Sequence, residues 1–467
     1  AMGDELWTRA ATELAAMIAG GETSSREVVD AHLARIDEVN GDLNAVVRVL
    51  ADGARAGADA ADAAVAAGGP LGPFHGVPFT IKENLDCTCS PTTQGVPAFA
   101  EAVPTVDSPV VERMKAAGAI PLARTNLPEL GLRISTNNPL HGLTRNPWTP
   151  DLTAGGSSGG EAASLASGMS PFGLGNDLGG SLRNPAYCCG ITSLKTSFGR
   201  LPGAGCLPPA DTQPLSFQLM GVEGPMARHV ADLRLGLEVM AGRHPRDPRS
   251  VTVPFDGAPT ARRAAILTEV PGGPIHPAVA DGVRKAADAM EAAGWELVEA
   301  TPPEMEQCQE VWARMLSCDM PAMVGAATEI MSEGALGLLN DLIGRFPPDE
   351  VPAILVHTEY HRLATAWAGF FDANPVLVAP TWTRTPFAHD ADVSEGGIDL
   401  MLDVMRCITP VNLLGIPAAA VPVGVADGIP QGVQVMADRY REDLCLDAAA
   451  DIEAALGTIT PIDPVTG

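Results

Sequence analysis

The sequence predicts an α/β fold, in which a large mixed, mostly parallel β-sheet is covered by helices on both faces. Two observations favour it. Short apolar runs of strand length alternate with helical patterns through the first half of the chain. Similar runs return near the C-terminus, as PVLVAPT and IPAAAVPVGV. Because these runs are apolar throughout, we expect strands that are buried on both faces.

The length of the chain allows one large domain or two to three smaller ones, since it has 467 residues of which 46% are hydrophobic. We expect a single domain, 1–467. Its expected segments are an N-terminal helical segment (1–67), a core that carries the chemical motifs (68–245), a variable helical cap (250–374), and C-terminal strands and a helix that complete the core (375–467).

The first segment has the apolar spacing of amphipathic helices from Leu6 to about Ala67. Ser24 or Ser25 is a suitable N-cap, and Glu27 would then lie in the first turn. A glycine pair that begins at Gly68 is expected to end the last, alanine-rich helix.

The core segment then alternates strands and helices. VPFTI reads as a strand that ends just before Lys82, and the helix SPVVERMKAAG leads into the strand AIPLART. The helix EAASLASG is followed by apolar SPFGLG and a turn at DLGG, which would leave Ser181 at the C-terminal edge of a strand. Ligand and catalytic sites of open α/β sheets gather at such edges. Later helices are PAVADGVRKAADAMEAAGW, EVWARMLSCDMPAMVGAATEIM and LCLDAAADIEAAL.

Charge and hydropathy exclude several partners. Thirty basic against 57 acidic residues give a net charge of −27, which argues against nucleic-acid binding. No apolar run reaches the roughly eighteen residues of a membrane span, so no membrane partner is expected. The N-terminal residues lack a secretory pattern, and we expect a cytoplasmic protein. The nine cysteines, which include Cys87 and Cys89, form no C-x-x-C motif and are expected to be reduced thiols.

The stretch TAGGSSGG raises the question of which serine does chemistry. Its G-x-S-x-G pattern would make Ser158 the nucleophile of an α/β-hydrolase. A phosphate-binding loop would need a lysine after the glycines, and none is there. Ser181 behind DLGG is another candidate. The α/β-hydrolase alternative would use one of the histidines that follow, His229, His357, His361 or His389.

Three motifs read together favour a different answer. Lys82 lies in GVPFTIKENLD, Ser157 follows it by 75 residues in GGSSGGEAASLASG, and Ser181 follows by another 24 in GLGNDLGGSLRNPA. These motifs and spacings resemble the amidase signature family, whose members hydrolyse amides with a Ser-Ser-Lys triad. The resemblance covers most of the chain, and extends to ARTNLPELG, NPLHGLTRNPW, GPMARHVADL and NLLGIPAAAVPVGVADGIPQGVQVM.

The resemblance implies roles for individual residues. Ser181 would be the nucleophile, Ser157 a bridging serine preceded by a cis peptide bond from Gly156, and Lys82 the base. A lysine can act as a base only when it is neutral, so burial must lower its pKa from about 10.4 toward neutrality.

The resemblance also implies the surroundings of the triad. Backbone N–H groups of Leu178, Gly179, Gly180 and Ser181 would form the oxyanion hole. Ser158 would be a supporting hydrogen-bonding residue, and the Asp177 and Arg183 side chains would fix the turn.

The implied activity is amide hydrolysis through an acyl-enzyme, without metal or cofactor. Small-molecule amides, aryl esters and carbamates (urethanes) are the expected substrates, as in free-standing broad-range amidases and aryl acylamidases, and the enzyme would be a monomer or homodimer. Two further alternatives are the glutaminase subunit of a tRNA-dependent amidotransferase and a non-catalytic, amidase-like binding scaffold.

The proline-rich stretch from Leu201 to Met220 is expected to form a loop beside the site. An apolar face on this loop would favour apolar or aryl acyl groups. The residues of that face would be Leu207, Leu215, Phe217 and Leu219.

Overall fold

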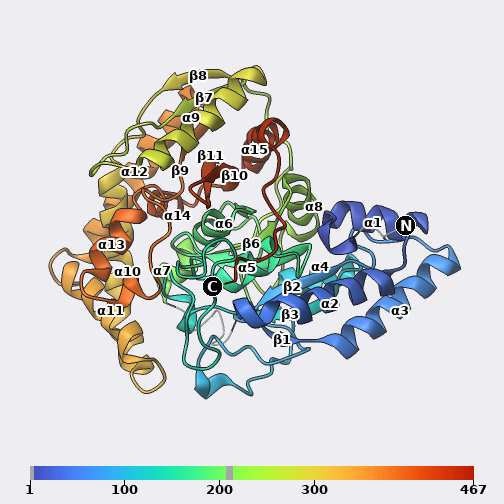
Figure 1. Ribbon diagram of the computed structural model, residues 1–467. Helices are drawn as coiled ribbons and strands as arrows, with labels where there is room; N and C mark the ends of the chain where they lie inside the picture. Colours follow the sequence, from blue (N-terminus) through green and yellow to red (C-terminus); the bar gives the residue numbers. More distant parts are fainter. Residues whose placement is uncertain (1–4, 207–213, 467) are drawn as a thin grey trace.

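The computed structural model of the protein describes residues 5–206 and 214–466. Within them, eleven strands form one sheet in the spatial order β1-β3-β2-β4-β6-β5-β10-β11-β9-β7-β8 (Figure 1). The strands are β1 (Val46–Val49), β2 (Pro78–Lys82), β3 (Ile120–Thr125), β4 (Phe172–Asp177), β5 (Thr192–Lys195), β6 (Val222–Ala227), β7 (Arg263–Ile266), β8 (Glu296–Glu299), β9 (Val376–Pro380), β10 (Ala418–Ala426) and β11 (Ile429–Ala437).

Helices cover this sheet, with α1 to α3 at one end of the molecule and α10, α11 and α13 at the other (Figure 1). They are α1 (Ala11–Gly20), α2 (Ser25–Leu43), α3 (Ala51–Ala67), α4 (Pro109–Ala116), α5 (Gly159–Ala166), α6 (Arg183–Cys189), α7 (Leu215–Met220), α8 (Val230–Met240), α9 (Pro277–Ala292), α10 (Met305–Ala327), α11 (Glu333–Arg345), α12 (Ala353–Ala373), α13 (Gly397–Val404), α14 (Thr409–Leu414) and α15 (Glu442–Leu456).

Both faces of the sheet are buried, as predicted. Along β9, Val376 and Val378 belong to one hydrophobic core, and Leu377 and Ala379 belong to the other. Successive side chains of a strand point to opposite faces, so the two cores lie on the two sides of the sheet. One core is built mainly with α1, α4, α8, α9 and α15, and the other with α2, α3, α5, α6 and α10 to α14.

The mixed α/β sheet is confirmed, but its parallel share is smaller than predicted. Among the described strands, four neighbouring pairs are parallel and six are antiparallel. The cause is clearest at β10 and β11, which are joined by Asp427 and Gly428 alone, both with positive φ. A two-residue Asp-Gly connection makes a hairpin, whereas parallel neighbours need a crossover of a dozen or more residues.

Most of the expected elements occur in the structure. Ser24 caps α2 and forms a capping box with Glu27, and Gly68 ends α3 with a φ of 68°. Six strands were missed: β1 inside the expected N-terminal helical segment, β5 and β6 in the expected core segment, β7 and β8 inside the expected helical cap, and β11 after the predicted strand β10. β1, β5, β7 and β8 have only four residues each, too few for a clear alternation.

The cysteines differ from the expectation in one place. Cys87 and Cys89 form a disulfide, and the remaining seven cysteines are thiols. The turn after β2 brings the two Cα atoms to 5.2 Å, within the range that a disulfide requires, although only one residue separates them. As for membranes, no helix in the described parts of the chain is long and apolar enough to cross one.

Candidate active site

The candidate residues gather at one edge of the sheet, where the neighbouring parallel strands β2 and β4 end. Lys82 is the last residue of β2, and Asp177 is the last residue of β4. Ser157 lies two residues before α5, and Ser181 lies in the turn between β4 and α6. The carboxyl ends of parallel strands meet at one edge of a sheet, so segments far apart in sequence come together here.

Lys82 is fully buried and donates two hydrogen bonds. Its Nζ lies 2.7 Å from Ser157 Oγ and 2.6 Å from Asn176 Oδ1. Burial lowers the pKa of Lys82 to about 7, although the nearby acidic side chains of Glu223 and Asp177, to the extent that they are ionised, oppose this change. A substantial fraction of the Lys82 side chain is therefore an uncharged amine near neutral pH.

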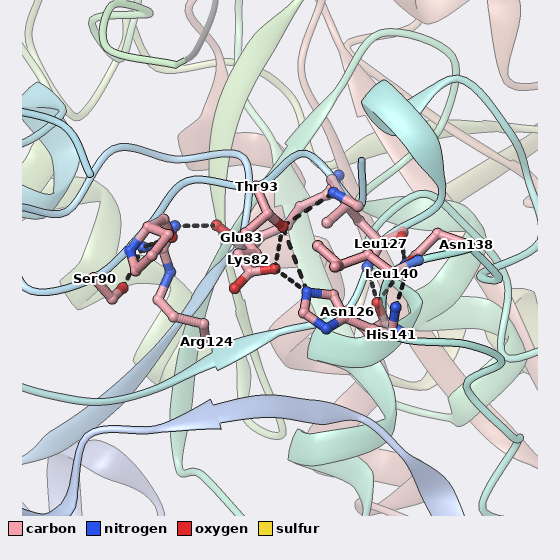
Figure 2. A network of polar contacts seen from close by, with 12 residues as sticks. Lys82, Glu83, Ser90, Thr93, Arg124, Asn126, Leu127, Asn138, Leu140 and His141 are labelled. Carbon is pink, nitrogen blue, oxygen red and sulfur yellow. Dashed lines mark hydrogen bonds and ion pairs between the residues drawn. The ribbon is translucent and has the colours of Figure 1, made fainter. Parts of the chain in front are cut away.

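Glu83, the next residue along the chain, does not pair with Lys82. Its buried carboxylate is held by His141, whose Nε2 lies 2.6 Å from Oε2, and by a short hydrogen bond from Thr93 (Figure 2). In the described chain no ion pair involves Lys82. The amine therefore lacks the direct carboxylate partner that would hold it charged.

The turn after β2 is fixed by a buried arginine that sequence reasoning missed. Arg124 of β3 donates hydrogen bonds to the carbonyl oxygen of Leu85 at 2.6 Å and to Ser90 Oγ at 2.7 Å (Figure 2). Within this turn, Asn84 exchanges side-chain hydrogen bonds of 3.0 and 3.3 Å with Asn176, the second partner of Lys82. Asn176 of β4 therefore binds the Lys82 amine directly, and Arg124 of β3 fixes the turn that follows Lys82.

The peptide bond between Gly156 and Ser157 is cis. Gly156 packs tightly, because a Cβ at this position would lie 2.7 to 2.9 Å from backbone atoms of Arg133, Ile134 and Ser135. Only glycine fits in this space. The backbone that carries the Ser157 hydroxyl toward Lys82 is thus closely confined by its neighbours.

Ser181 is 7% exposed and follows Gly180, whose φ of 89° allows the sharp turn. Both Ser157 and Ser181 border the main cavity. Within the described residues no hydrogen bond joins their two hydroxyl groups. Catalytic hydrogen bonds are often long before substrate binds and shorten in the complex.

The turn before Ser181 differs from the expectation at Gly180. The N–H of Gly180 donates to Asp177 Oδ1 at 2.7 Å, so this amide is already occupied. The N–H groups of Leu178, Gly179 and Ser181 make no hydrogen bond within the described chain. These three amides remain as oxyanion-hole candidates, and Gly180 instead helps to fix the turn.

Asp177 and Arg183 form a fully buried ion pair behind this turn. The Arg183 Nε lies 3.1 Å from Asp177 Oδ2, and Asn412 Nδ2 donates to Oδ1 at 2.7 Å. Burial alone would raise the pKa of Asp177, but the charge and hydrogen bonds of Arg183 and the hydrogen bond from Asn412 lower it to about 2. The carboxylate therefore stays charged and continues to hold the Gly180 amide.

Ser158 does not match the nucleophile of an α/β-hydrolase. Its Oγ is buried without a hydrogen-bond partner, so no histidine activates it. The Ser158 backbone N–H donates to the carbonyl oxygen of Ser181 at 3.3 Å, so its support for the site comes from the backbone and not from the hydroxyl. The four histidines lie elsewhere: His229 precedes α8, His357 and His361 are exposed on α12, and His389 contacts the Pro150 carbonyl.

Two cavities meet at Ser181. The main cavity, about 500 Å³, also contacts Ser157, Asn176 and Glu223. The second, about 60 Å³, reaches Ser181 from the side of the helices α10, α11 and α13, and its wall is mostly apolar. Its apolar residues include Leu132, Trp312, Leu316, Met320, Leu339 and Met405.

The expected substrate loop is in part a helix. Pro214 precedes α7, whose six residues contain neither glycine nor proline. Phe217 borders the main cavity as predicted, whereas Leu215 is 46% exposed and borders a different pocket of about 30 Å³. Leu219 packs against the hydrophobic core, and Leu207 lies outside the described residues.

No group of three or more His, Cys, Asp or Glu side chains in the described residues is arranged to hold a metal ion. The chemistry that these residues can perform is proton transfer and nucleophilic attack. A neutral amine bonded to Ser157, two hydroxyl groups at one cavity and unoccupied backbone amides in the neighbouring turn suit acyl transfer.

Comparison with known proteins identifies the family. The sequence model of the Amidase family matches residues 27–446. The chain belongs to the amidase signature family. This amidase is 41% identical over 460 residues to the indoleacetamide hydrolase of Bradyrhizobium diazoefficiens. The alignment covers 97% of this chain and 88% of the relative. It is also 32% identical to a glutamyl-tRNA(Gln) amidotransferase subunit of Salinispora arenicola, with 98% of this chain and 99% of the relative covered.

Solved structures agree with this assignment. A bacterial aryl acylamidase of the amidase signature family superimposes with a TM-score of 0.82 at 29% identity, covering 96% of each chain. The 6-aminohexanoate cyclic dimer hydrolase gives a TM-score of 0.83 at 28% identity, covering 97% of this chain and 98% of the other. The amidase is therefore an amide hydrolase with the fold that its sequence predicted.

Proposed function

We propose that this amidase hydrolyses small aryl-substituted amides through an acyl-enzyme on Ser181, with Ser157 as the proton relay and Lys82 as the base. The observation that carries the proposal is the 2.7 Å hydrogen bond from the buried Lys82 amine to the Ser157 hydroxyl. Burial that lowers the pKa of this amine to about 7 supports its role as a base near neutral pH.

The reaction then has two halves. Ser181 Oγ bonds to the amide carbon, while its proton passes to Ser157 and the Ser157 proton passes to Lys82. The carbon–nitrogen bond breaks, and the leaving amine takes a proton back from Lys82 through Ser157. Water attacks the acyl-enzyme by the same relay and releases the carboxylic acid. The negative charge on the carbonyl oxygen would be stabilised by the amides of Leu178, Gly179 and Ser181.

The substrate class is proposed from the relatives and from the cavity. The indoleacetamide hydrolases named among its relatives act on an aryl acetamide, and the main cavity has apolar walls that suit an aromatic ring. Aryl esters and carbamates present a carbonyl of the same geometry, so we expect the same residues to attack them. The apolar residues that contact the main cavity include Leu130, Leu132, Phe198, Leu201, Phe217 and Met323.

Three variants test the triad with indole-3-acetamide as substrate. We expect Lys82→Ala, Ser157→Ala and Ser181→Ala each to lower kcat/KM by about 10³-fold or more, since each removes a step of the relay. Ser158→Ala is the matched control, because its hydroxyl makes no hydrogen bond, and it should retain most of the activity. Full activity in Lys82→Ala would contradict the mechanism.

The pH dependence gives a second test. Only the neutral form of Lys82 can accept a proton, and its pKa is about 7. We therefore expect kcat/KM of the wild type to rise with pH and to level off above an apparent pKa near 7. A rate that falls as the pH rises from about 6 to about 8, by contrast, would assign the base to another group.

A fluorophosphonate probe distinguishes the remaining alternatives. A binding scaffold without activity should leave Ser181 unlabelled, whereas the proposed enzyme should be labelled there. A glutaminase subunit should hydrolyse glutamine only with partner subunits present. The higher identity to the indoleacetamide hydrolase than to the amidotransferase subunit favours the free-standing enzyme.

A further inference from the structure

Glu223 is a buried carboxylic acid in the wall of the main cavity, and the proposed triad does not use it. It is 8% exposed and lies on β6, directly opposite Asn176 of β4 in the antiparallel register. Residues directly opposite in an antiparallel pair carry their side chains on the same face. Glu223 therefore lies on the face where Asn176 binds Lys82, one strand further along the sheet.

The Glu223 carboxyl group differs from those of Asp177, Glu83 and Glu161, because among the residues that the structure describes it has no ion-pair partner and accepts no hydrogen bond from a hydroxyl group. Its Oε2 is buried without a hydrogen bond, and no ion pair in the described chain includes it. By contrast, Asp177 has Arg183, Glu83 has His141, and Glu161 accepts hydrogen bonds from Thr80 and Thr125. Because the carboxyl group borders the cavity and has no ion-pair partner within the described residues, a ligand that supplies a hydrogen-bond donor there would reduce the cost of burying it.

We propose that Glu223 is a specificity-determining residue, which accepts a hydrogen bond from an N–H group on the acyl part of the substrate, such as the indole N–H. The inference rests on the proposed function, because it places an aromatic acetamide in the main cavity. To that function the inference adds a residue that distinguishes a substrate ring with an N–H group from a ring of the same shape without one.

The electrostatics favour a neutral donor over a cation. Burial raises the pKa of Glu223 to about 8, although the nearby Lys82 and Asn176 oppose this change. The carboxyl group is therefore largely uncharged at neutral pH, and its carbonyl oxygen can accept a hydrogen bond from a neutral N–H. A cationic ligand would require the carboxylate form.

The two arginines at the cavity do not compete for this position. Arg246 binds Glu112 at 2.8 Å, and Arg249 donates to the backbone carbonyl of Gln218 at 2.8 Å. Apolar neighbours at the same wall, Phe217 and Val222, suit the hydrocarbon part of an aromatic ring. Glu223 thus combines a hydrogen-bond acceptor with an apolar surface, which is the pattern of a site that orients a mostly apolar ligand.

The test compares two substrates on the same enzyme. Indole-3-acetamide carries the ring N–H, and benzofuran-3-acetamide has an oxygen in its place. We expect the wild type to prefer the indole amide in kcat/KM by about tenfold or more, and Glu223→Leu to lower this preference to about one. Glu223→Gln keeps an acceptor and should retain most of the preference. Any effect of the variants on Lys82 is common to both substrates and cancels in the ratio.

The outcomes separate the two proposals. An unchanged preference in Glu223→Leu, with both amides still hydrolysed, would overturn the role of Glu223 and leave the proposed function intact. If the wild type hydrolyses neither amide while the probe labels Ser181, the proposed substrate class is wrong and the inference falls with it. Thermal unfolding of each variant shows whether it folds. If Glu223→Leu does not fold, Glu223→Gln is compared with Glu223→Asp. The shorter side chain of Glu223→Asp should then lower the preference for the indole amide.

Discussion

At the scale of single residues, the sequence motifs select residues that lie close together in the fold, but they do not specify all the contacts of these residues. Ser157 and Ser181 border one cavity, and the buried Lys82 donates a hydrogen bond to Ser157. Asn176 and Glu223 were missed because they belong to no local pattern. They reach the site through the register of β4 and β6, which short-range sequence signals do not specify.

Gly180 illustrates the same limit. Its position in the DLGG turn suggested a free amide. In the structure, its N–H donates a hydrogen bond to the side chain of Asp177, three residues earlier. That contact depends on where Arg183 and Asn412 hold the carboxylate, and Asn412 comes from a distant helix. The residue types of this turn are therefore easier to predict than the amides that remain unoccupied.

The buried pair behind this turn gives a prediction on stability. Arg183→Met should lower the free energy of unfolding by about 3–5 kcal/mol, because it leaves the Asp177 carboxylate buried without its counter-charge. Arg234→Met is the control. It breaks an exposed pair with Asp447 and should change stability by less than about 1 kcal/mol. Denaturant titration measures both values, and equal losses would argue that the buried pair has no special role.

At the scale of elements, the strands and helices with clear signals were predictable. VPFTI overlaps β2, SPFGLG overlaps β4, and α2 begins at the capping box of Ser24. The direction of neighbouring strands was less predictable. The Asp-Gly pair between β10 and β11 was a readable hairpin signal, whereas β5 and β6 become neighbours only through tertiary packing.

Two glycines in helices make a prediction at this scale. A Cβ on Gly160 of α5 would lie 2.3 Å from Asn126 N and 2.6 Å from Ala45 O, so Gly160→Ala should destabilise the protein by about 1–3 kcal/mol. Gly369 of α12 has nothing within 4 Å of its Cβ position. Gly369→Ala should therefore stabilise by about 0.5–1 kcal/mol, as expected for an exposed helix. Thermal unfolding of both variants checks the opposite signs, and shifts in the same direction would refute the packing argument.

At the scale of the whole molecule, segments from both halves of the chain build one sheet. The strands β5 and β10 are neighbours in this sheet, although four strands and the helices α7 to α14 lie between them in the sequence. We propose on this basis that residues 1–467 act as one domain. The short strands β7 and β8 of the expected cap region extend the same sheet.

The acidic composition gives a prediction for the whole protein. With 57 acidic and 30 basic residues, the folded state carries a large net negative charge that repels itself. Raising the ionic strength from about 0.01 M to about 0.15 M shortens the screening length from about 30 Å to about 8 Å, so Tm should rise by a few degrees. Sodium and potassium chloride should act alike if screening is the cause. A Tm that falls with either salt would contradict this explanation.

The meeting of two cavities at Ser181 has a consequence for inhibitor design. With Ser181 as the proposed nucleophile, a compound that reacts with its hydroxyl could extend substituents in two directions from its electrophile, one into the larger chamber beside Glu223 and one between the helices near Trp312. Each arm would then contact different parts of the chain. Varying the arms separately would tune potency on one side and selectivity among related serine hydrolases on the other.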